Sequence, residues 1–589
     1  MNKGEQEITF KSLFFPFTTK KAIVFIIIIG LAVFFNSLFN GFVGDDKSYI
    51  INYVPLHTIN IPFLVGTNLF NIGGQYRPVP AIYFSILYAL FSNMAFFYHS
   101  LQIILQIICT VLIFKFFNKF LSIGIAFFAA LIFLVHPMNV ESVGYIAQTV
   151  NPLFVLFGLI ALFISTKKKL SVIEFLVIFL LLLLSILTKE TGVLFVVLII
   201  IYQLLFSGEN LRKLSIISFL VVIAYLPIRF FVGQVSFSTR FLPPIADLTL
   251  LGRLTQMPSL IIYYLRTFFF PLHLAMDQEW LNVNLNFANF YLPLILEISV
   301  IMLLIFYGCY LYKNQNKYFK PFLFFAAWFG FGLLMHLQIF PLDATVADRW
   351  FYFPMAGLIG LLAVIYQSLS LKFTKQKTIF LILSVIIVSS LSLRTMVRNT
   401  NWIDPITLFT HDIKTSDNYN IEEVLGVEYS QKGDAQDALK HFQRSISFRP
   451  YEGNLHNLGV IYAVNLGQTD KAKIAFQMAL NAKDYKITPG HRHVLNTYVD
   501  YATILIFYDK NPKTAIPFIL NALHDYPDSA DLYVLLGIAK YEQRDKAGAL
   551  AAIKTAYHVN SHTYLYNQIE NNLPFKINIY NKTFTFSPL

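Results

Sequence analysis

Two adjacent carboxylates, Asp45 and Asp46, follow the first long apolar run of the sequence, in the stretch GFVGDDKSYI. Like charges this close raise one another's pKa, so the pair is costly to hold at a membrane–water interface. A site that handles a cation, a proton or a sugar hydroxyl has a use for such a pair. The simpler interpretation is a hydrated loop that happens to contain two acids, and the pair alone does not decide between them.

Further residues suited to acid–base chemistry or anion binding recur at the ends of apolar runs. Carboxylates there can take a proton from a hydroxyl group, and Arg or Lys can hold a phosphate. Each also has a structural interpretation, because an Arg can anchor a helix end and a neighbouring Lys and Glu can pair with each other. The two histidines are expected to form hydrogen bonds and not to bind zinc. These residues are Tyr76, Arg77, His99, His136, Glu141, Lys189, Glu190 and Arg349.

The elements that must position these residues are membrane helices. Of the 589 residues, 56% are hydrophobic and only 13% are charged, which is typical of a membrane protein. Eleven apolar segments are near the length that crosses a bilayer core of ~30 Å. They are residues 22–38, 97–116, 120–135, 150–166, 171–187, 191–207, 213–231, 290–311, 320–338, 351–370 and 378–393. The first is interpreted as an anchor and not as a cleaved signal peptide.

The basic residues lie in alternate loops between these segments, for example Lys167 to Lys169. By the positive-inside rule those loops are cytoplasmic, and the acidic loops with the residues named above lie on the outer side. Residues 79–94 and 256–273 are also apolar. Counting only one of them as a crossing would place the later basic loops on the outer side of the membrane. We expect both to be helices at the outer interface, and a pair of additional crossings is the alternative.

After Arg398 the apolar runs stop and a period near 34 residues appears. Leu425-Gly426, Leu458-Gly459 and Leu536-Gly537 begin units that match the tetratricopeptide pattern, and a degenerate unit lies around Ala515. The sequence therefore predicts an all-α protein: a membrane helix bundle over residues 1–398, then a soluble α-solenoid over 399–589 with an irregular or extended tail. Such arrays hold peptides or proteins on a concave surface, and a spacer without catalytic relevance is the alternative.

Several function classes lack support in the sequence. The formal charge of +12 comes from loops between membrane segments, so nucleic-acid binding is not indicated. Cys109 and Cys309 are both inside apolar segments and provide no disulfide framework. No Walker loop, dinucleotide fingerprint or zinc-spaced cluster is present. We expect a membrane enzyme without a nucleotide site to take its donor from the lipid.

The outer-loop motifs resemble a known family. The runs NSLFNGFVGDDKSYI and QYRPVPAIYFSILYALF, followed by HPMNVESVGYIAQTVN, LTKETGVLF and ADRWFYFPMAGL, are similar in order and spacing to the transmembrane and tetratricopeptide-repeat containing proteins. These are glycosyltransferases of the GT-C class. The resemblance runs from the first apolar segment to the repeats. The sequence is rich in Phe, Ile, Lys and Asn, which suggests an AT-rich bacterial genome.

The resemblance implies an inner-membrane enzyme that transfers mannose or a similar hexose from a polyprenyl-phosphate lipid to a protein hydroxyl. It implies that Asp45 and Asp46 activate the acceptor, that Glu141 is the second-loop acid, and that Lys189 and Arg349 contact the lipid phosphate. The repeats would lie outside the cytoplasm and hold the acceptor protein. No cofactor is firmly implied, and a divalent cation at the acidic pair stays open.

One departure from the family pattern stands in the second loop. Relatives often carry Arg-x-Asp after the loop acid, whereas this chain has Thr149, Val150 and Asn151. A charge pair is therefore missing, which bears on the identity of the donor sugar. Two alternatives stay open: a non-catalytic membrane scaffold whose repeats recruit envelope proteins, and a transferase that acts on polysaccharide or lipid.

Overall fold

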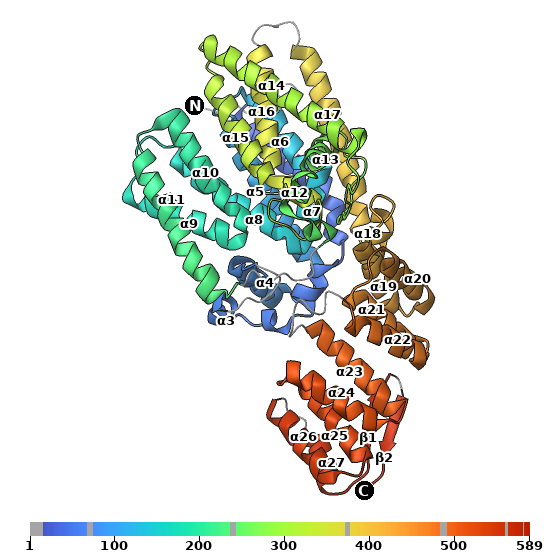
Figure 1. Cartoon of the computed structure of the whole chain (residues 1–589). Helices are drawn as coiled ribbons and strands as arrows, with labels where there is room; N and C mark the ends of the chain where they lie inside the picture. Colours follow the sequence, from blue (N-terminus) through green and yellow to red (C-terminus); the bar gives the residue numbers. More distant parts are fainter. Residues whose placement is uncertain are drawn as a thin grey trace, which may run out of the picture. The chain divides into compact units, whose positions relative to one another are not determined.

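The computed structural model describes residues 16–66, 75–235, 243–370, 377–482, 492–559, 563–580 and 582–588. Within these residues the protein is helical apart from a single two-stranded antiparallel sheet. The backbone divides by its contacts into two compact units, one ending at Ser416 and the other running from Asp417 to the C-terminus (Figure 1). The boundary predicted at residue 398 stays a prediction, and α18 beyond it belongs to the first unit by its contacts.

The first unit is a helix bundle built from the apolar runs of the sequence. Its helices are α2 (Thr19–Phe34), α3 (Ile61–Gly66), α4 (Pro78–Phe91), α5 (Ala95–Phe117), α6 (Ile123–Val135), α7 (Val140–Gly144), α8 (Val150–Ser165), α9 (Val172–Thr188), α10 (Val193–Tyr202), α11 (Leu211–Pro227), α12 (Leu250–Leu254), α13 (Met257–Phe269), α14 (Leu292–Lys313), α15 (Phe319–Leu334), α16 (Tyr352–Ser370), α17 (Lys377–Asn401) and α18 (Pro405–Asp412).

Eight helices of the described residues are long and apolar enough to cross a membrane, or nine if the bent pair of α6 with residues 137–144 forms one span. The protein is thus an integral membrane protein. Two predicted crossings correspond to α9 and α15, which have 17 and 16 residues and fall short of that length. The count of eleven crossings therefore stays a prediction. Helices α4 and α13, expected at the interface, have 14 and 13 residues.

Burial separates central from peripheral helices. The span that contains α16 is 78% buried, whereas those of α11, α14 and α17 are between 11% and 17% buried. An apolar helix that exposes most of its surface is stable where lipid surrounds it. Helix α5 packs against α2, α6 and α8, and α16 packs against α6 and α15 (Figure 1). The bundle centre therefore lies around α5, α6, α8 and α16, and the polar site is built at their ends.

The second unit is an array of helix pairs. The pairs are α19 (Tyr419–Lys432) with α20 (Ala435–Phe448), α21 (Glu452–Val460) with α22 (Thr469–Leu480), α23 (Arg492–Phe507) with α24 (Pro512–Asp525), and α25 (Ala530–Glu542) with α26 (Lys546–Val559), followed by α27 (Thr563–Glu570). A Cβ on Gly459 would lie 2.4 Å from the Phe476 ring, and one on Gly426 2.6 Å from Phe442. The glycines of the sequence period are thus where paired helices approach most closely.

The tail beyond residue 570, expected to be irregular or extended, forms a hairpin of β1 (Phe575–Ile579) and β2 (Lys582–Phe586). Phe584 contacts the ring of Phe507 at the end of α23, and Phe575 contacts Tyr541 of α25. The Tyr580 hydroxyl donates to Asp500 of α23 at 2.7 Å. The hairpin therefore packs on the first helices of the last two pairs.

Candidate functional site

The acidic pair stands in a tight turn that treats its two members differently. Gly44 has a φ of +51°, a left-handed conformation that glycine adopts without strain. The turn directs the Asp45 backbone amide to the Tyr145 hydroxyl oxygen at 2.9 Å. The Asp46 carboxylate accepts the amides of Val43 at 3.1 Å and of Ala147 at 2.6 Å. Asp46 is thus bonded to both its own loop and the second loop.

The two carboxyl groups also differ in exposure. Asp46 is fully buried, whereas Asp45 is half-buried. Burial raises the pKa of the Asp46 carboxyl well above its ordinary value, and the amides of Val43 and Ala147 counter only part of this effect. Asp45 is therefore the more accessible member of the pair, and Asp46 connects its own loop to the loop that carries Ala147.

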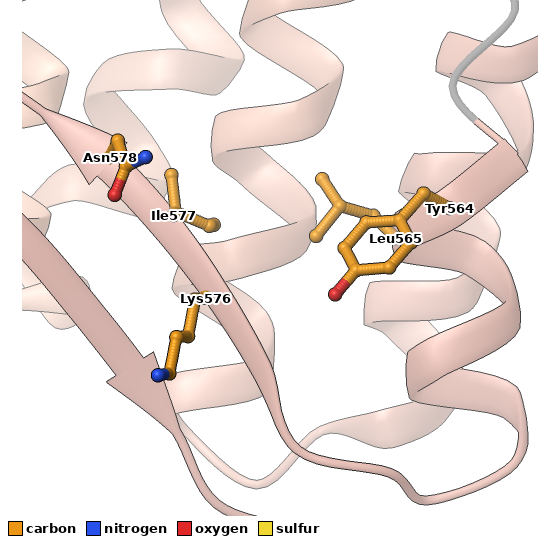
Figure 2. A pocket seen from close by; sticks show the side chains of 5 residues that line it. All are labelled: Tyr564, Leu565, Lys576, Ile577 and Asn578. Atoms are coloured by element: carbon orange, nitrogen blue, oxygen red, sulfur yellow. The ribbon is translucent and has the colours of Figure 1, made fainter.

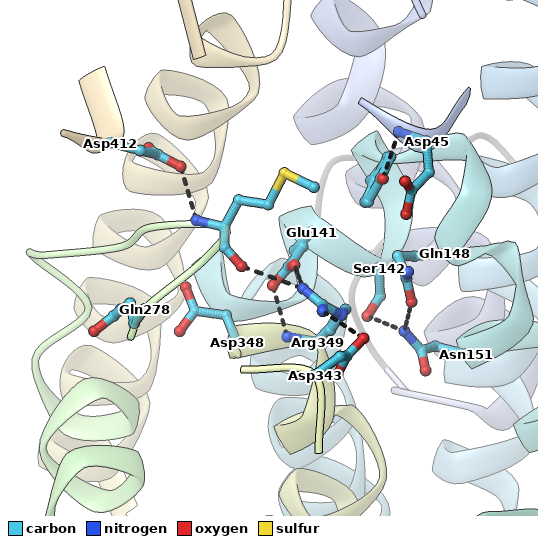
Figure 3. A network of polar contacts seen from close by, with 12 residues as sticks. Asp45, Glu141, Ser142, Gln148, Asn151, Gln278, Asp343, Asp348, Arg349 and Asp412 are labelled. Atoms are coloured by element: carbon cyan, nitrogen blue, oxygen red, sulfur yellow. Dashed lines mark hydrogen bonds and ion pairs between the residues drawn. The ribbon is translucent and has the colours of Figure 1, made fainter. Parts of the chain in front are cut away.

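The second-loop acid is paired with the arginine that begins α16. Glu141 is 3% exposed and accepts the Arg349 guanidinium at 2.5 Å and the Arg349 backbone amide at 2.8 Å (Figure 3). The same guanidinium donates to the Met276 carbonyl at 3.2 Å and lies 3.7 Å from the Asp343 carboxylate. Arg349 does not pair with its neighbour Asp348, which accepts the Tyr263 hydroxyl instead. The Arg349 charge is thus balanced inside the protein.

Lys189 lies at the junction between α9 and the next span, and it is 8% exposed. Its ammonium donates to the Asn151 side-chain oxygen at 2.6 Å. The Asn151 amide nitrogen donates to Ser142 and to Gln148 (Figure 3). Asn151 is the residue at which the sequence departs from the family pattern. The departure therefore gives Lys189 a neutral partner where a carboxylate would have balanced its charge.

Glu190 binds two arginines. Its carboxylate accepts Arg77 at 2.9 and 3.1 Å and Arg229 at 3.3 Å. Arg229 follows Pro227 in a π-helical turn at Ile228–Val232, and its guanidinium also donates to the Tyr225 hydroxyl at 2.6 Å. Such turns are frequent at functional sites. The alternative that Lys189 and Glu190 pair with each other is wrong.

The remaining predicted residues make structural contacts. The Tyr76 hydroxyl donates to the Val65 carbonyl at 2.6 Å, and the His136 Nε2 lies 2.9 Å from the Phe268 carbonyl. His136 Nδ1 accepts the Met138 amide, so both ring nitrogens are used. His99 is fully buried in α5, where its ring lies beside the backbone of Asn40 and Gly41. These contacts indicate positions that shape the site.

Arg229 and the pair of Asp412 with Arg398 lie near the site but were not predicted from the sequence. Arg229 stands alone in an apolar run, which is itself a signal of function. Asp412 of α18 accepts both guanidinium nitrogens of Arg398 at 2.6 and 3.0 Å and the Met276 amide at 2.7 Å. Its partner lies 14 residues earlier, beyond the reach of a motif, so no sequence signal indicated the pair. The pair fixes the loop that carries Met276, which also contacts Arg349.

The acidic pair and the residues around it offer few ligands for a metal ion. Both Asp46 oxygens already accept backbone amides, so this carboxylate is committed to the loop structure. In the residues that the structure describes, no group of three His, Cys, Asp or Glu side chains is placed to bind one ion. The residues present therefore do not fit a divalent cation here.

A cavity of about 280 Å³ in the second unit lies between α27 and β1 (Figure 2). It is lined by Tyr564, Leu565, Lys576, Ile577 and Asn578. This lining contains no carboxylate and no histidine, and its ionisable groups are those of Tyr564 and Lys576. The groups suited to chemistry belong to the helix bundle.

Comparison with known proteins agrees with the resemblance seen in the motifs. No family model matches the chain. It is 24% identical over 574 residues to the human protein O-mannosyl-transferase TMTC3, and 24% identical over 578 residues to the mouse protein of that name; both matches cover 88% of the chain. It is 25% identical over 451 residues to the Caenorhabditis elegans protein O-mannosyl-transferase F38B6.6, over 72% of the chain. The chain spans about three fifths of the length of these relatives.

Proposed function

We propose that this protein is a GT-C glycosyltransferase that moves mannose or a similar hexose from a polyprenyl-phosphate lipid to Ser or Thr of a protein. The observation that carries the proposal is that one short segment, residues 147–151, contacts both the acidic pair and Lys189. Ala147 binds Asp46 next to Asp45, and Asn151 binds Lys189. These two contacts, four residues apart in the sequence, support a site in which an acceptor-activating carboxylate and a phosphate-binding cation act together. The names of the similar proteins support the same reaction.

In the proposed reaction Asp45 accepts the proton of the acceptor hydroxyl. The hydroxyl oxygen forms a bond to the anomeric carbon of the sugar as the bond from that carbon to the phosphate oxygen breaks. The electron pair of the broken bond stays on the lipid phosphate, where Lys189 balances the new charge. Asp46 positions Asp45 through the turn at Gly44, and we propose that Arg349 positions Glu141 and the second loop. General-base assistance contributes typically ~10²–10⁴-fold to such a step.

We further propose that the helix pairs of the second unit are tetratricopeptide repeats that hold the acceptor protein. The close glycine contacts between paired helices support this assignment. The positive-inside rule supports a position of this unit outside the cytoplasm, and we propose that the membrane is a bacterial inner membrane. Reporter fusions after Lys169 and after Arg398 should report opposite sides of the membrane, and two cytoplasmic reports would contradict this arrangement.

The test of function is transfer by the purified full-length chain. The enzyme in detergent or nanodiscs is mixed with a polyprenyl-phosphate mannose and with proteins of the native envelope, and mass spectrometry identifies hexose on Ser or Thr. Asp45→Asn serves as the inactive control. A scaffold would give no hexose with either protein, and a transferase for polysaccharide or lipid would leave proteins unmodified while consuming the donor. Either result would replace the proposal.

A further inference from the structure

Two arginines bind one carboxylate beside the proposed donor site, and a lysine precedes that carboxylate in the sequence. Arg77 and Arg229 both bind Glu190, and Lys189 is the residue before it. The side chains of Arg77 and Arg229 are 18% and 14% exposed, and that of Glu190 is 28% exposed. Together with Lys189 they form a cluster that is largely withdrawn from water but still open at one side.

The cluster carries more positive than negative charge. Lys189 donates to the neutral Asn151, and no carboxylate of the described residues lies within ion-pair distance of its ammonium. Arg349, the other candidate for an anion, is balanced by Glu141 and Asp343. Buried cations without a matching anion are costly and mark sites of function when they persist.

We propose that the cluster of Arg77, Lys189 and Arg229 around Glu190 is the site that binds the phosphate of the lipid, and that it binds a phosphate monoester more tightly than a diester. This inference rests on the proposed function and names the groups that hold its leaving group. It adds Arg77 and Arg229 to the donor site and takes Arg349 out of it.

The preference follows from charge. The sugar-bearing lipid is a phosphodiester with one negative charge, whereas the lipid phosphate left after transfer carries about −1.5 to −2 near pH 7. The bond from the anomeric carbon to the phosphate oxygen breaks with its electron pair on that oxygen, so the second charge develops during the step. A cluster with more than one excess cation stabilises that charge more than the donor's single charge, and such differential binding accelerates a reaction. Guanidinium groups also suit phosphate geometry, because they donate two parallel hydrogen bonds.

Direct binding measurements on the full-length protein test the site without needing transfer. A short-chain polyprenyl phosphate, the matching methyl phosphodiester and the matching prenyl alcohol are titrated by calorimetry, with inorganic phosphate as a further arm. We expect the monoester to bind about tenfold or more tightly than the diester, and the alcohol to bind weakest. Competition by inorganic phosphate alone would indicate a site for the free ion and would overturn the lipid assignment.

Four variants test the site, because they are expected to weaken, tighten or leave unchanged the binding of the monoester. Lys189→Gln and Arg229→Gln should each weaken monoester binding by about tenfold or more. Glu190→Gln removes the one negative charge and keeps an oxygen that accepts from Arg77, so it should tighten monoester binding severalfold. A purely structural ion-pair cluster predicts that Glu190→Gln only destabilises the protein. Lys167→Gln changes an exposed lysine at the other end of α8 and should leave binding unchanged.

Failure of this site and failure of the proposed function give different results. If Lys189→Gln and Arg229→Gln bind the monoester as the unmodified protein does, the site is wrong even where sugar transfer to proteins is observed. If binding follows the expected pattern but no protein is modified, the phosphate site stands and the transferase proposal fails. Melting temperatures measured beside each titration show whether a variant is folded.

Discussion

Arg349 holds the Glu141 carboxylate from two directions, with its guanidinium 2.5 Å from Oε1 and its backbone amide 2.8 Å from Oε2. Both side chains are nearly inaccessible, at 11% and 3% exposure. The contact joins the loop that carries Glu141 to the turn just before α16 across 208 residues of sequence. An arginine placed in this way is a structural connection between two parts of the site.

Replacing Arg349 tests this connection. Arg349→Ala leaves Glu141 buried with the backbone amide as its remaining partner, and losing one member of a buried ion pair costs about 3–5 kcal/mol. Arg349→Lys keeps the charge but not the planar fork, so we expect a smaller loss of about 1–3 kcal/mol. Thermal unfolding in detergent measures both losses. An unchanged melting temperature with a large drop in transfer per folded molecule would instead support the phosphate contact predicted from the sequence.

The two acids of the pair should respond differently to the same substitution. Asp45→Asn is expected to lower transfer by ~10²–10⁴-fold with the melting temperature unchanged, because it removes the proposed base from a half-buried position. Asp46→Asn places an amide donor against a backbone amide donor, and a buried unsatisfied donor costs about 1–3 kcal/mol. Near-full activity of Asp45→Asn would eliminate it as the base.

The Asp46 pKa predicts a pH dependence of stability. Because the folded-state pKa is raised above the value of about 4 in the unfolded chain, the folded state binds the proton more tightly. The stabilisation is complete below the unfolded value and is lost as the pH rises through the folded value. Asp46→Asn, which cannot ionise, should remove this component of the pH profile. Unfolding at a series of pH values measures it, with Asp45→Asn as the matched comparison.

Donor binding should depend on the protonation of Lys189. Burial, with a further contribution from Arg77, lowers the pKa of Lys189 to about 7. The ammonium is therefore charged below this pH and neutral above it, so affinity for the phosphodiester donor should fall as the pH rises through about 7. The diester itself keeps one charge over this range. Lys189→Arg stays charged and should give a flat profile; the same fall in that variant would show that another group is responsible.

The buried pair of Asp412 with Arg398 should stabilise the first unit. Burial opposes ionisation of Asp412, but Arg398 and His411 outweigh it and hold the pKa below its ordinary value. Its contribution is thus present above a pH of about 4 and is lost as the pH falls through the folded value. Asp412→Asn should cost about 3–5 kcal/mol near neutral pH. Asp404→Asn is the control, because Asp404 caps α18 from an exposed position and Asn caps equally well.

The apolar runs predicted the helices well, because burial in lipid requires long uninterrupted stretches of apolar residues. Helix α5, for example, runs from Ala95 to Phe117 where residues 97–116 were expected. The sequence could not separate Asp45 from Asp46, since the difference comes from the Ala147 amide 101 residues away. Nor could it show that Arg229 reaches Glu190, because that depends on the π-helical turn after Pro227.

The two contacts made by Ala147 and Asn151 also fix the number of residues between them. Ala147 anchors the acid pair and Asn151 holds Lys189, and little more than one helical turn separates them. One turn rises ~5.4 Å, and each residue rotates the chain by about 100°. One added residue would therefore turn Asn151 away from Lys189 while Ala147 kept its bond to Asp46. The stretch should tolerate changes of side chain far better than any change in the number of residues.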